Sequence, residues 1–353
     1  VGQASAMIGI SAIILTFSAI FALLSLVERK VLARIHNRRG PNRAGPFGIF
    51  QPIADGIKML TKQDLVPRAS DALLHFWAPV IVLIPALLSF AIIPFGEGMV
   101  LVDLSSGILF FFALGALIEV GIFMAGWSSR SKFSLLGSMR AIAQVISYEL
   151  PLVLAATAVV MMTASLSPTE IVAAQGGYRL GFIPNWYLLT PWGVAAGLLF
   201  YIASLAESNR SPFDLPEGES ELVAGHMTEY SGFKYALFFM AEYFGMMAAG
   251  AMFVTLFLGG WQAPLPLLEF IPSWAWFFLK LAAVLVTVIW IRGTLPRFRI
   301  DHLMNTCWKV FIPMGLLLLP AAALCHYAGN GLLAAGFTLI VLGLPYALYA
   351  REY

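Results

Sequence analysis

The chain has 353 residues, of which 60% are hydrophobic and 11% are charged, and its formal net charge is +2. This composition excludes an ordinary soluble domain, because apolar runs of about 20 residues are typical of transmembrane helices. The small net charge gives no reason to expect a nucleic-acid partner. The two cysteines, Cys307 and Cys325, are too few for a disulfide framework, and their spacing is not a metal-binding motif.

Nine apolar segments predict transmembrane helices. Residues 1–27 carry no charge and lack the basic start of a cleaved signal peptide, so they predict the first span. In chain order the predicted spans are 5–27, 72–94, 104–127, 136–164, 188–208, 234–258, 273–291, 309–328 and 331–350. The sequence therefore predicts an all-α, polytopic integral membrane protein in which residues 1–353 form a single transmembrane domain.

The distribution of lysine and arginine predicts the orientation of these spans. Nine of these residues lie in the loop after the first span, whereas the loops expected on the opposite side contain only Arg179. Cytoplasmic loops of membrane proteins are enriched in lysine and arginine. We therefore expect the N-terminus outside the cell membrane and the C-terminus in the cytoplasm.

The first cytoplasmic loop, residues 28–71, combines turn signals with an amphipathic helix. The segment GPNRAGP (40–46) contains two Gly-Pro pairs, which stop a helix, and Pro52 suits the first turn of a new one. Apolar residues then recur with helical spacing, as in a helix that lies in the membrane interface. This segment is either a surface anchor or the rim of a portal. In the second case a polar cavity would be faced by Arg29, Arg38 and Asp55.

Carboxylates lie within or at the ends of four consecutive predicted spans, at Glu119, Glu149, Glu207 and Glu242. An ionised side chain at a helix centre costs roughly 2.5–3.5 kcal/mol, so four together approach about 10 kcal/mol. This cost excludes positions that face lipid, and the side chains must pair, bind protons or line water. Isolated structural hydrogen bonds are the alternative, but four acids in consecutive spans favour a functional set.

The loop after the fifth span, residues 207–233, is acidic although it lies on the side where basic residues prevail. It is a solvated surface, a wall facing the first loop, or a docking surface for another subunit. Its carboxylates are Asp214, Glu217, Glu219, Glu221 and Glu229. Basic residues in and beside the loop after the seventh span suit ordinary cytoplasmic anchors on charge alone, and they include Arg292, Arg297 and Arg299.

The sequence contains no CxxC pair, no P-loop and no GxGxxG after a strand. Its five histidines are scattered and form neither a haem nor a zinc pattern. We therefore expect no metal site, no catalytic residue and no redox centre in this chain.

Several long motifs resemble the family of the H subunit of respiratory complex I, the proton-pumping NADH:quinone oxidoreductase. The resemblance covers almost the whole chain, and the ninth span favours a bacterial source. Small departures at His36, Leu295 and His302 affect only details of the loops. The motifs are residues 26–62, GWSSRSKFSLLGSMR (126–140), ISYELPL (146–152), AESNRSPFDLPEGESELVAGHMTEYSG with ALFFMAEY (206–243), and WIRGTLPRFRIDHLM (290–304).

The resemblance implies a translocase component of the respiratory chain in the bacterial inner membrane, with a periplasmic N-terminus. It would form a tunnel that admits a quinone, either ubiquinone or menaquinone, and would couple quinone reduction to proton translocation. FMN and iron–sulfur clusters would belong to partner subunits. The implied partners are the peripheral-arm quinone-site and terminal iron–sulfur subunits, the small membrane subunits, the antiporter-like subunits and membrane lipids.

The same motifs imply roles for individual residues. The implied tunnel residues are Glu28, Arg29, Arg38, Asp55, Phe213, Asp214, Arg292 and Arg297. The implied proton or charge relay consists of Glu119, Glu149, Glu207 and Glu242. Two alternatives stay open, a membrane anchor of a related energy-converting hydrogenase and a stand-alone ion transporter. The complete PFDLPEGESELVAGHMTEY run favours complex I, and the lack of an evident internal repeat weighs against a transporter.

Overall fold

Helices form nearly all of the regular structure in the computed structural model, which describes residues 2–179, 181–216, 218–328 and 331–350. The α-helices are α1 (Gly2–Ile35), α2 (Gln51–Thr61), α3 (Ala72–Leu88), α4 (Gly107–Ser128), α5 (Lys132–Thr163), α6 (Pro168–Ala174), α7 (Pro191–Glu207), α8 (Glu219–Leu222), α9 (Gly232–Phe257), α10 (Ser273–Thr294), α11 (Ile300–Thr306), α12 (Ile312–Ala328) and α13 (Gly331–Ala350). Short 3₁₀ helices lie at Pro46–Gly48, Ser89–Ile92, Tyr187–Leu189, Gly225–Met227 and Pro266–Leu268, and a π-helical segment at Cys307–Phe311 joins α11 to α12. One antiparallel hairpin pairs β1 (Tyr178–Arg179) with β2 (Ile183–Pro184).

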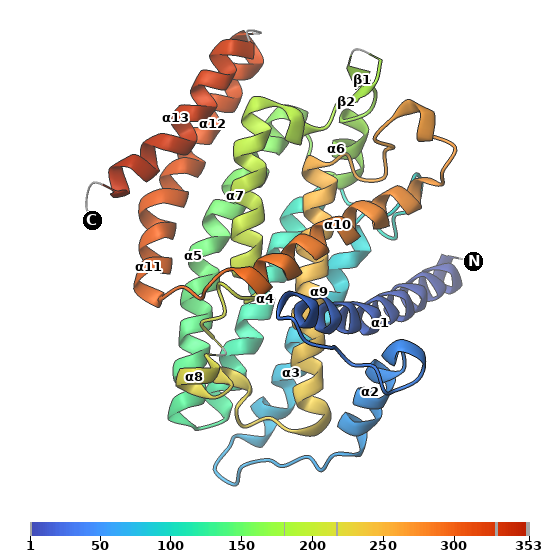
Figure 1. Cartoon of the computed structure of the whole chain (residues 1–353), viewed down its shortest axis with the longest axis vertical. Coiled ribbons are helices and arrows are strands. Elements are labelled where there is room, and N and C mark those ends of the chain that lie inside the picture. Colours follow the sequence, from blue (N-terminus) through green and yellow to red (C-terminus); the bar gives the residue numbers. More distant parts are fainter. Residues whose placement is uncertain (1, 180, 217, 329–330, 351–353) are drawn as a thin grey trace.

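The long helices form a bundle around α9 (Figure 1). Helix α3 packs against α4 and α9, while α5 packs against α4, α7 and α12. In Figure 1, α1 crosses the bundle at a steep angle, and it contacts α2, α9 and α10. The most apolar stretch of α9 is 72% buried, against 33–50% for the other five candidate spans. A polar side chain on α9 is therefore enclosed by several neighbouring helices.

Six helical segments among the described residues have the length and hydropathy of a membrane span. They are Ala72–Ile92, Gly107–Ser128, Lys132–Thr163, Gly232–Phe257, Ser273–Thr294 and Ile300–Tyr327. Helix α7 is apolar but has only 17 residues. The all-α polytopic membrane fold is confirmed, whereas the number of nine spans stays a prediction.

Local signals explain where several helices begin and end. Asp71 caps α3 by accepting a hydrogen bond from the Leu74 amide, and Thr190 caps α7 in the same way. Helix α1 continues to Ile35, well beyond the predicted end of the first span at residue 27. Residues 10–39 contain no glycine or proline that would interrupt the helix before Gly40. Glu28 and Arg29 therefore lie on α1, which continues into the first part of the predicted loop.

Candidate functional site

A cavity of about 60 Å³ lies inside the bundle among α4, α7 and α9. Its polar lining consists of Glu119, Glu207, Ser208, Asn209, His226 and Glu242. Glu149 of α5 does not line the cavity but lies close enough to Glu119 and Glu207 to repel both electrostatically. The structure thus brings the four span carboxylates, which the sequence placed on four separate helices, into one region.

Some oxygen atoms of the cavity carboxylates have no hydrogen-bond partner in the protein. Glu119 Oε1 and Glu207 Oε2 are buried and have no hydrogen-bond partner among the described residues. Gly115 keeps space beside them, since a Cβ there would lie 3.2 Å from Glu207 Oε1. Buried polar atoms without a protein partner are rare unless water or a bound proton completes them. This region is therefore suited to holding water and exchanging protons.

A buried network of charges joins this cavity to α1. Glu28 accepts hydrogen bonds from Arg292 of α10 and, at 2.6 Å, from the Tyr243 hydroxyl of α9. Arg210, in the loop after α7, lies 3.7 Å from Glu28 and 3.9 Å from Glu242. Its guanidinium also lies over the Tyr243 ring, 4.1 Å from the centroid. Because Glu242 lines the cavity, side-chain contacts run from Arg292 to the carboxylate cluster.

Two formal positive charges and two formal negative charges balance in this network. Each buried ion loses several kcal/mol of hydration, which close partners of opposite sign can offset. Removing Arg210 would take away the guanidinium that Glu28 and Glu242 share, whereas removing Arg292 would leave Glu28 with Arg210 as its counter-ion. The side chains come from α1, α9, α10 and the loop after α7, so the network depends on all four segments being packed together.

An ion pair and hydrogen bonds connect the first loop to α1. Arg29 Nη1 lies 2.5 Å from Asp55 Oδ2, and Gln51 donates to the other Asp55 oxygen at 3.1 Å. Lys30 donates to the main-chain carbonyl of Phe47. The Arg29 and Asp55 side chains are 46% and 33% exposed, so solvent screens this ion pair. These contacts place α2 beside the last turns of α1.

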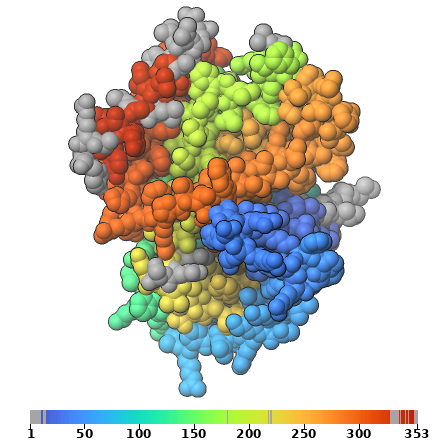
Figure 2. All heavy atoms as spheres, in the orientation of Figure 1, coloured from blue at the N-terminus to red at the C-terminus, as the bar shows by residue number. Residues whose placement is uncertain are grey.

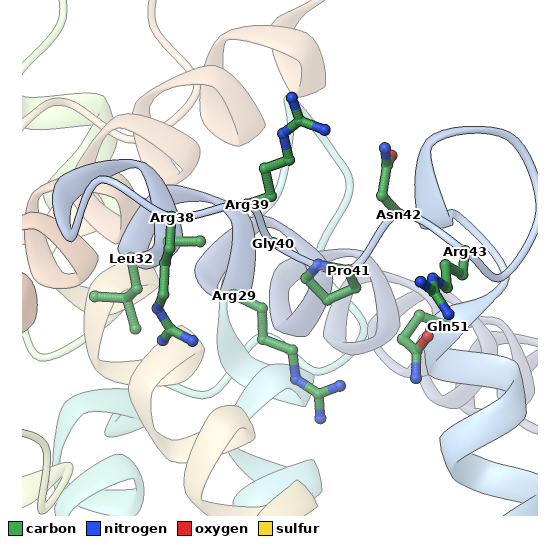
Figure 3. Close-up of a pocket in the computed structure, with 10 residues that line it drawn as sticks. Arg29, Leu32, Arg38, Arg39, Gly40, Pro41, Asn42, Arg43 and Gln51 are labelled. Atoms are coloured by element: carbon green, nitrogen blue, oxygen red, sulfur yellow. The ribbon is translucent and has the colours of Figure 1, made fainter.

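An open hollow of about 770 Å³ lies next to this connection and is lined mainly by arginine and by loop residues. Its arginines are Arg29, Arg38, Arg39 and Arg43. Figure 3 shows Arg29 and Arg38 extending to one side of the loop and Arg39 to the other. Apolar contact comes from Leu32. The hollow presents hydrogen-bond donors and positive charge beside an apolar wall.

Helix α2 exposes a row of apolar side chains at Ile53, Ile57 and Leu60. Figure 2 shows the first loop, in blue, on the molecular surface beside the orange segment that holds α10 and α11. An exposed apolar face flanked by basic residues is typical of a helix in the membrane interface. The hollow therefore lies beside a helix whose surface suits the membrane interface.

The acidic loop contacts α5 through an ion pair. Glu221 pairs with Arg140 at 2.6 Å, and this guanidinium lowers the pKa of the carboxyl. Glu217 lies outside the described residues, and nothing is described of the Glu219 side chain. Glu229 is partly buried. Toward the first loop, Ser231 of the acidic loop accepts a hydrogen bond from the Leu65 amide at 2.7 Å, and Lys234 of α9 pairs with Asp64 at 2.7 Å.

The loops after α7 and α10 pack on each other. The Phe213 ring lies 5.6 Å from both the Tyr148 and Phe298 rings, between centroids. Arg297 donates to the main-chain carbonyl of Asp214. Arg297 thus contributes a contact that fixes the two loops, beyond the anchoring role that its charge alone suggested.

Sequence reasoning missed several residues at the site. Arg210 and Tyr243 were not singled out, although both lie within the quoted motifs. His226 was counted among scattered histidines, yet it lines the carboxylate cavity. Burial lowers the pKa of its imidazole to about 4, so the ring is neutral near pH 7. Among the residues that the structure describes, no group of three histidine, cysteine or acidic side chains is arranged to hold a metal ion.

A helical bundle with apolar spans that encloses paired charges and carboxylates is typical of a polytopic integral membrane protein. The chain belongs to the NADH dehydrogenase family, whose family model matches residues 8–323. This result confirms the resemblance found in the motifs.

Similar curated proteins are named as the H subunit of NADH-quinone oxidoreductase. One from Dehalococcoides mccartyi is 46% identical and covers 93% of this chain and 89% of its own length. A protein from a second strain of that species is 49% identical over 82% of this chain and 78% of its own length. A protein from a Polaromonas species is 44% identical and covers 88% of each chain.

Proposed function

We propose that this chain is the membrane subunit of a bacterial proton-translocating NADH:quinone oxidoreductase that admits quinone and couples its reduction to proton translocation. The observation that carries the proposal is the buried network Arg292–Glu28–Arg210–Glu242. It links the neighbourhood of the arginine-lined hollow to the carboxylate cavity. The names of the relatives favour this function over a hydrogenase anchor or a stand-alone transporter.

The hollow beside α1 and α2 suits the entry of a quinone. Ligand sites commonly occupy about 300–1,000 Å³ and combine apolar walls with a few polar groups. Leu32 offers an apolar wall, while Arg29 and Arg38 offer donors to the quinone carbonyl oxygens. The exposed apolar face of α2 would place the entrance at the membrane interface, where a hydrophobic quinone tail can enter from lipid.

The charge network supplies a route for coupling. Reduction of a neutral quinone to a neutral quinol takes up two electrons and two protons, so a negative charge would exist near Arg292 only after electrons have arrived and before protons follow. A negative charge there competes with Glu28 for the arginines. Arg210 is then drawn less toward Glu28 and more toward Glu242, whose carboxylate lines the cavity with Glu207. This shift favours loss of a proton from the carboxylate cluster, and the reverse shift favours its return.

The proposal assigns electron carriers to partner subunits. FMN and iron–sulfur clusters would be held in the peripheral arm, which would meet the cytoplasmic end of this chain near α2 and the loop after α7. Small membrane subunits and antiporter-like subunits would contact the bundle within the bacterial inner membrane. Lysine and arginine counts support a periplasmic N-terminus and a cytoplasmic C-terminus.

A Glu28→Gln substitution in the assembled complex tests the proposal. The amide keeps the size of the side chain but removes the charge that holds Arg210 and Arg292. We expect NADH:quinone turnover and proton pumping to fall at least tenfold. Electron transfer from NADH to an added hydrophilic acceptor, which takes electrons from the peripheral arm, should stay near the wild-type rate. Arg140→Gln, which removes an exposed ion pair, serves as the matched control. Unchanged quinone turnover in Glu28→Gln would refute the coupling role.

A further inference from the structure

We propose that His226 is a proton-relay residue that passes protons between the carboxylate cavity and the loop after α7, a role that rests on the proposed function. The residue lies in the 3₁₀ turn Gly225–Met227, between α8 and α9. Its side chain lines the cavity together with carboxylates from three helices. His226 therefore belongs to the acidic loop and borders the interior carboxylates.

The histidine is held in place but keeps a ring nitrogen without a protein partner. The residue is 2% exposed, and its Nδ1 has no hydrogen-bond partner among the described residues. Ser134 of α5 donates to its main-chain carbonyl at 3.2 Å, and the ring meets the Phe238 ring at 5.5 Å between centroids. A positioned imidazole with an unsatisfied nitrogen beside a polar cavity is suited to exchange a proton.

The groups that face this histidine can donate and accept protons. The ionisable side chains lining the same cavity are Glu119 of α4, Glu207 of α7 and Glu242 of α9, and Arg210 lies beside Glu242. A buried water needs roughly 10–15 Å³ and two or more polar partners. A cavity of about 60 Å³ meets both requirements and can hold bridging water.

The transfer step balances with water as the only other reactant. A neutral carboxylic acid in the cavity gives its proton, directly or through water, to the unprotonated ring nitrogen. The imidazolium then gives the proton on its other nitrogen to a water molecule at the loop, which leaves a hydronium ion there, a carboxylate in the cavity and a neutral imidazole in its second tautomer. Both ring nitrogens of histidine can carry a proton, which makes such a shuttle possible.

His75 provides a matched control because it is also fully buried but does not line the cavity. Its ring stacks on the Tyr230 ring, with centroids 4.0 Å apart and planes 7° apart. This contact indicates a packing role. A phenylalanine at position 75 can preserve the stacking, whereas a phenylalanine at position 226 preserves a ring but removes the proton carrier.

The test compares His226→Phe, His226→Gln and His75→Phe in the whole complex in sealed vesicles. Rates of NADH:quinone turnover and of lumen acidification are expressed per assembled complex, so that reduced assembly does not distort them. Each variant is also assayed in D₂O. We expect both His226 variants to lose at least tenfold in turnover and pumping and to show a larger solvent isotope effect, because proton transfer becomes rate-limiting. His75→Phe should keep at least half of both activities and an unchanged isotope effect.

Two results would overturn the proposal. Wild-type turnover in His226→Phe or His226→Gln removes any proton role, and a lower rate with an unchanged isotope effect assigns the residue to packing. Glu207→Gln separates this inference from the proposed function. If Glu207→Gln lowers turnover and the His226 variants do not, only the histidine relay is wrong. If neither residue matters, the proposed function fails as well.

Discussion

Glu28 of α1 and Arg210 of the loop after α7 lie 3.7 Å apart, and each side chain is only 5% exposed. Neither charge could be buried at this depth alone, because an unpaired ion in a membrane bundle would lose its hydration without compensation. The pair therefore makes the position of α1 depend on the loop that follows α7. Glu242 and Arg292 extend the same dependence to α9 and α10.

Replacing Arg210 should destabilise the assembled complex. Arg210→Gln leaves Glu28 and Glu242 without their shared guanidinium, and breaking a buried ion pair typically costs about 3–5 kcal/mol. We expect a lower midpoint of thermal inactivation and less assembled complex. Arg210→Lys should lie between this variant and the wild type, because lysine keeps the charge but loses the planar fork. Arg140→Gln, at an exposed pair, should change little. Wild-type thermal stability of Arg210→Gln would show that the pair does not hold these segments together.

The carboxylate cluster was predictable from the sequence, but the network that reaches it was not. The cost of an ionised group in lipid applies to each span separately, so Glu119 and Glu207 could be assigned to the bundle interior without knowing their neighbours. The partner of Glu28 depends on how α1 packs against segments far along the chain. Arg210 follows an apolar helix on the basic side, where an ordinary cytoplasmic anchor is expected.

Lys280, within a predicted span, is another residue whose partners the sequence does not reveal. Its Nζ donates to the main-chain carbonyls of Leu258, Gly260 and Gln262, just after the C-terminus of α9, and lies over the Trp186 ring. The ends of helices leave carbonyls without partners, and a cation is favoured there. Nothing in the periodicity of α10 indicates which helix end its lysine will meet.

Lys280→Met should therefore weaken the packing of α9 on α10. Methionine fits the apolar surroundings but leaves three carbonyls without their donor, and each buried unsatisfied group costs about 1–3 kcal/mol. We expect a lower thermal midpoint of the complex. Lys58→Met, on the exposed side of α2, is the control and should leave the midpoint unchanged. An equal midpoint in both variants would mean that water replaces the ammonium at no cost.

The Arg29–Asp55 pair should matter for quinone access more than for stability. Exposed ion pairs contribute about 0–1 kcal/mol, so Arg29→Gln should leave the thermal midpoint close to the wild type. The same variant removes a donor from the hollow and should lower quinone reductase activity severalfold. Transfer from NADH to a hydrophilic acceptor should persist, because that acceptor takes electrons upstream. Equal losses in both assays would indicate failed assembly and would count against a role in access.

Thiol labelling of intact cells should establish the orientation. Phe182 is exposed in the segment 165–187, whereas Gln175 nearby is fully buried and bonded to main-chain groups. A thiol at position 182 should react with an impermeant reagent, and a thiol at Lys62 should react only after the cells are opened. Modification is measured on this chain by mass, and a variant lacking Cys307 and Cys325 provides the background. The reverse pattern would invert the topology.

The carboxylate cluster should control turnover and pumping together. Glu149→Gln and Glu207→Gln keep size and hydrogen bonding but remove ionisation. Glu149 lies close to both Glu119 and Glu207. A permanently neutral side chain at position 149 or 207 therefore changes the electrostatics of the whole cluster. If the cluster exchanges protons during each cycle, a neutral member stalls quinone reduction and proton translocation alike.

We therefore expect at least tenfold lower NADH:quinone turnover in Glu149→Gln and Glu207→Gln, with a parallel loss of lumen acidification in sealed vesicles. Glu207→Asp should retain part of both activities, because ionisation survives and only the reach of the side chain is shortened. Glu97→Gln is the matched control, since Glu97 is exposed and does not line the cavity. Full turnover with full pumping in both cluster variants would reduce these carboxylates to packing groups. Full turnover without pumping would show instead that the cluster moves protons but does not limit the chemistry of the quinone.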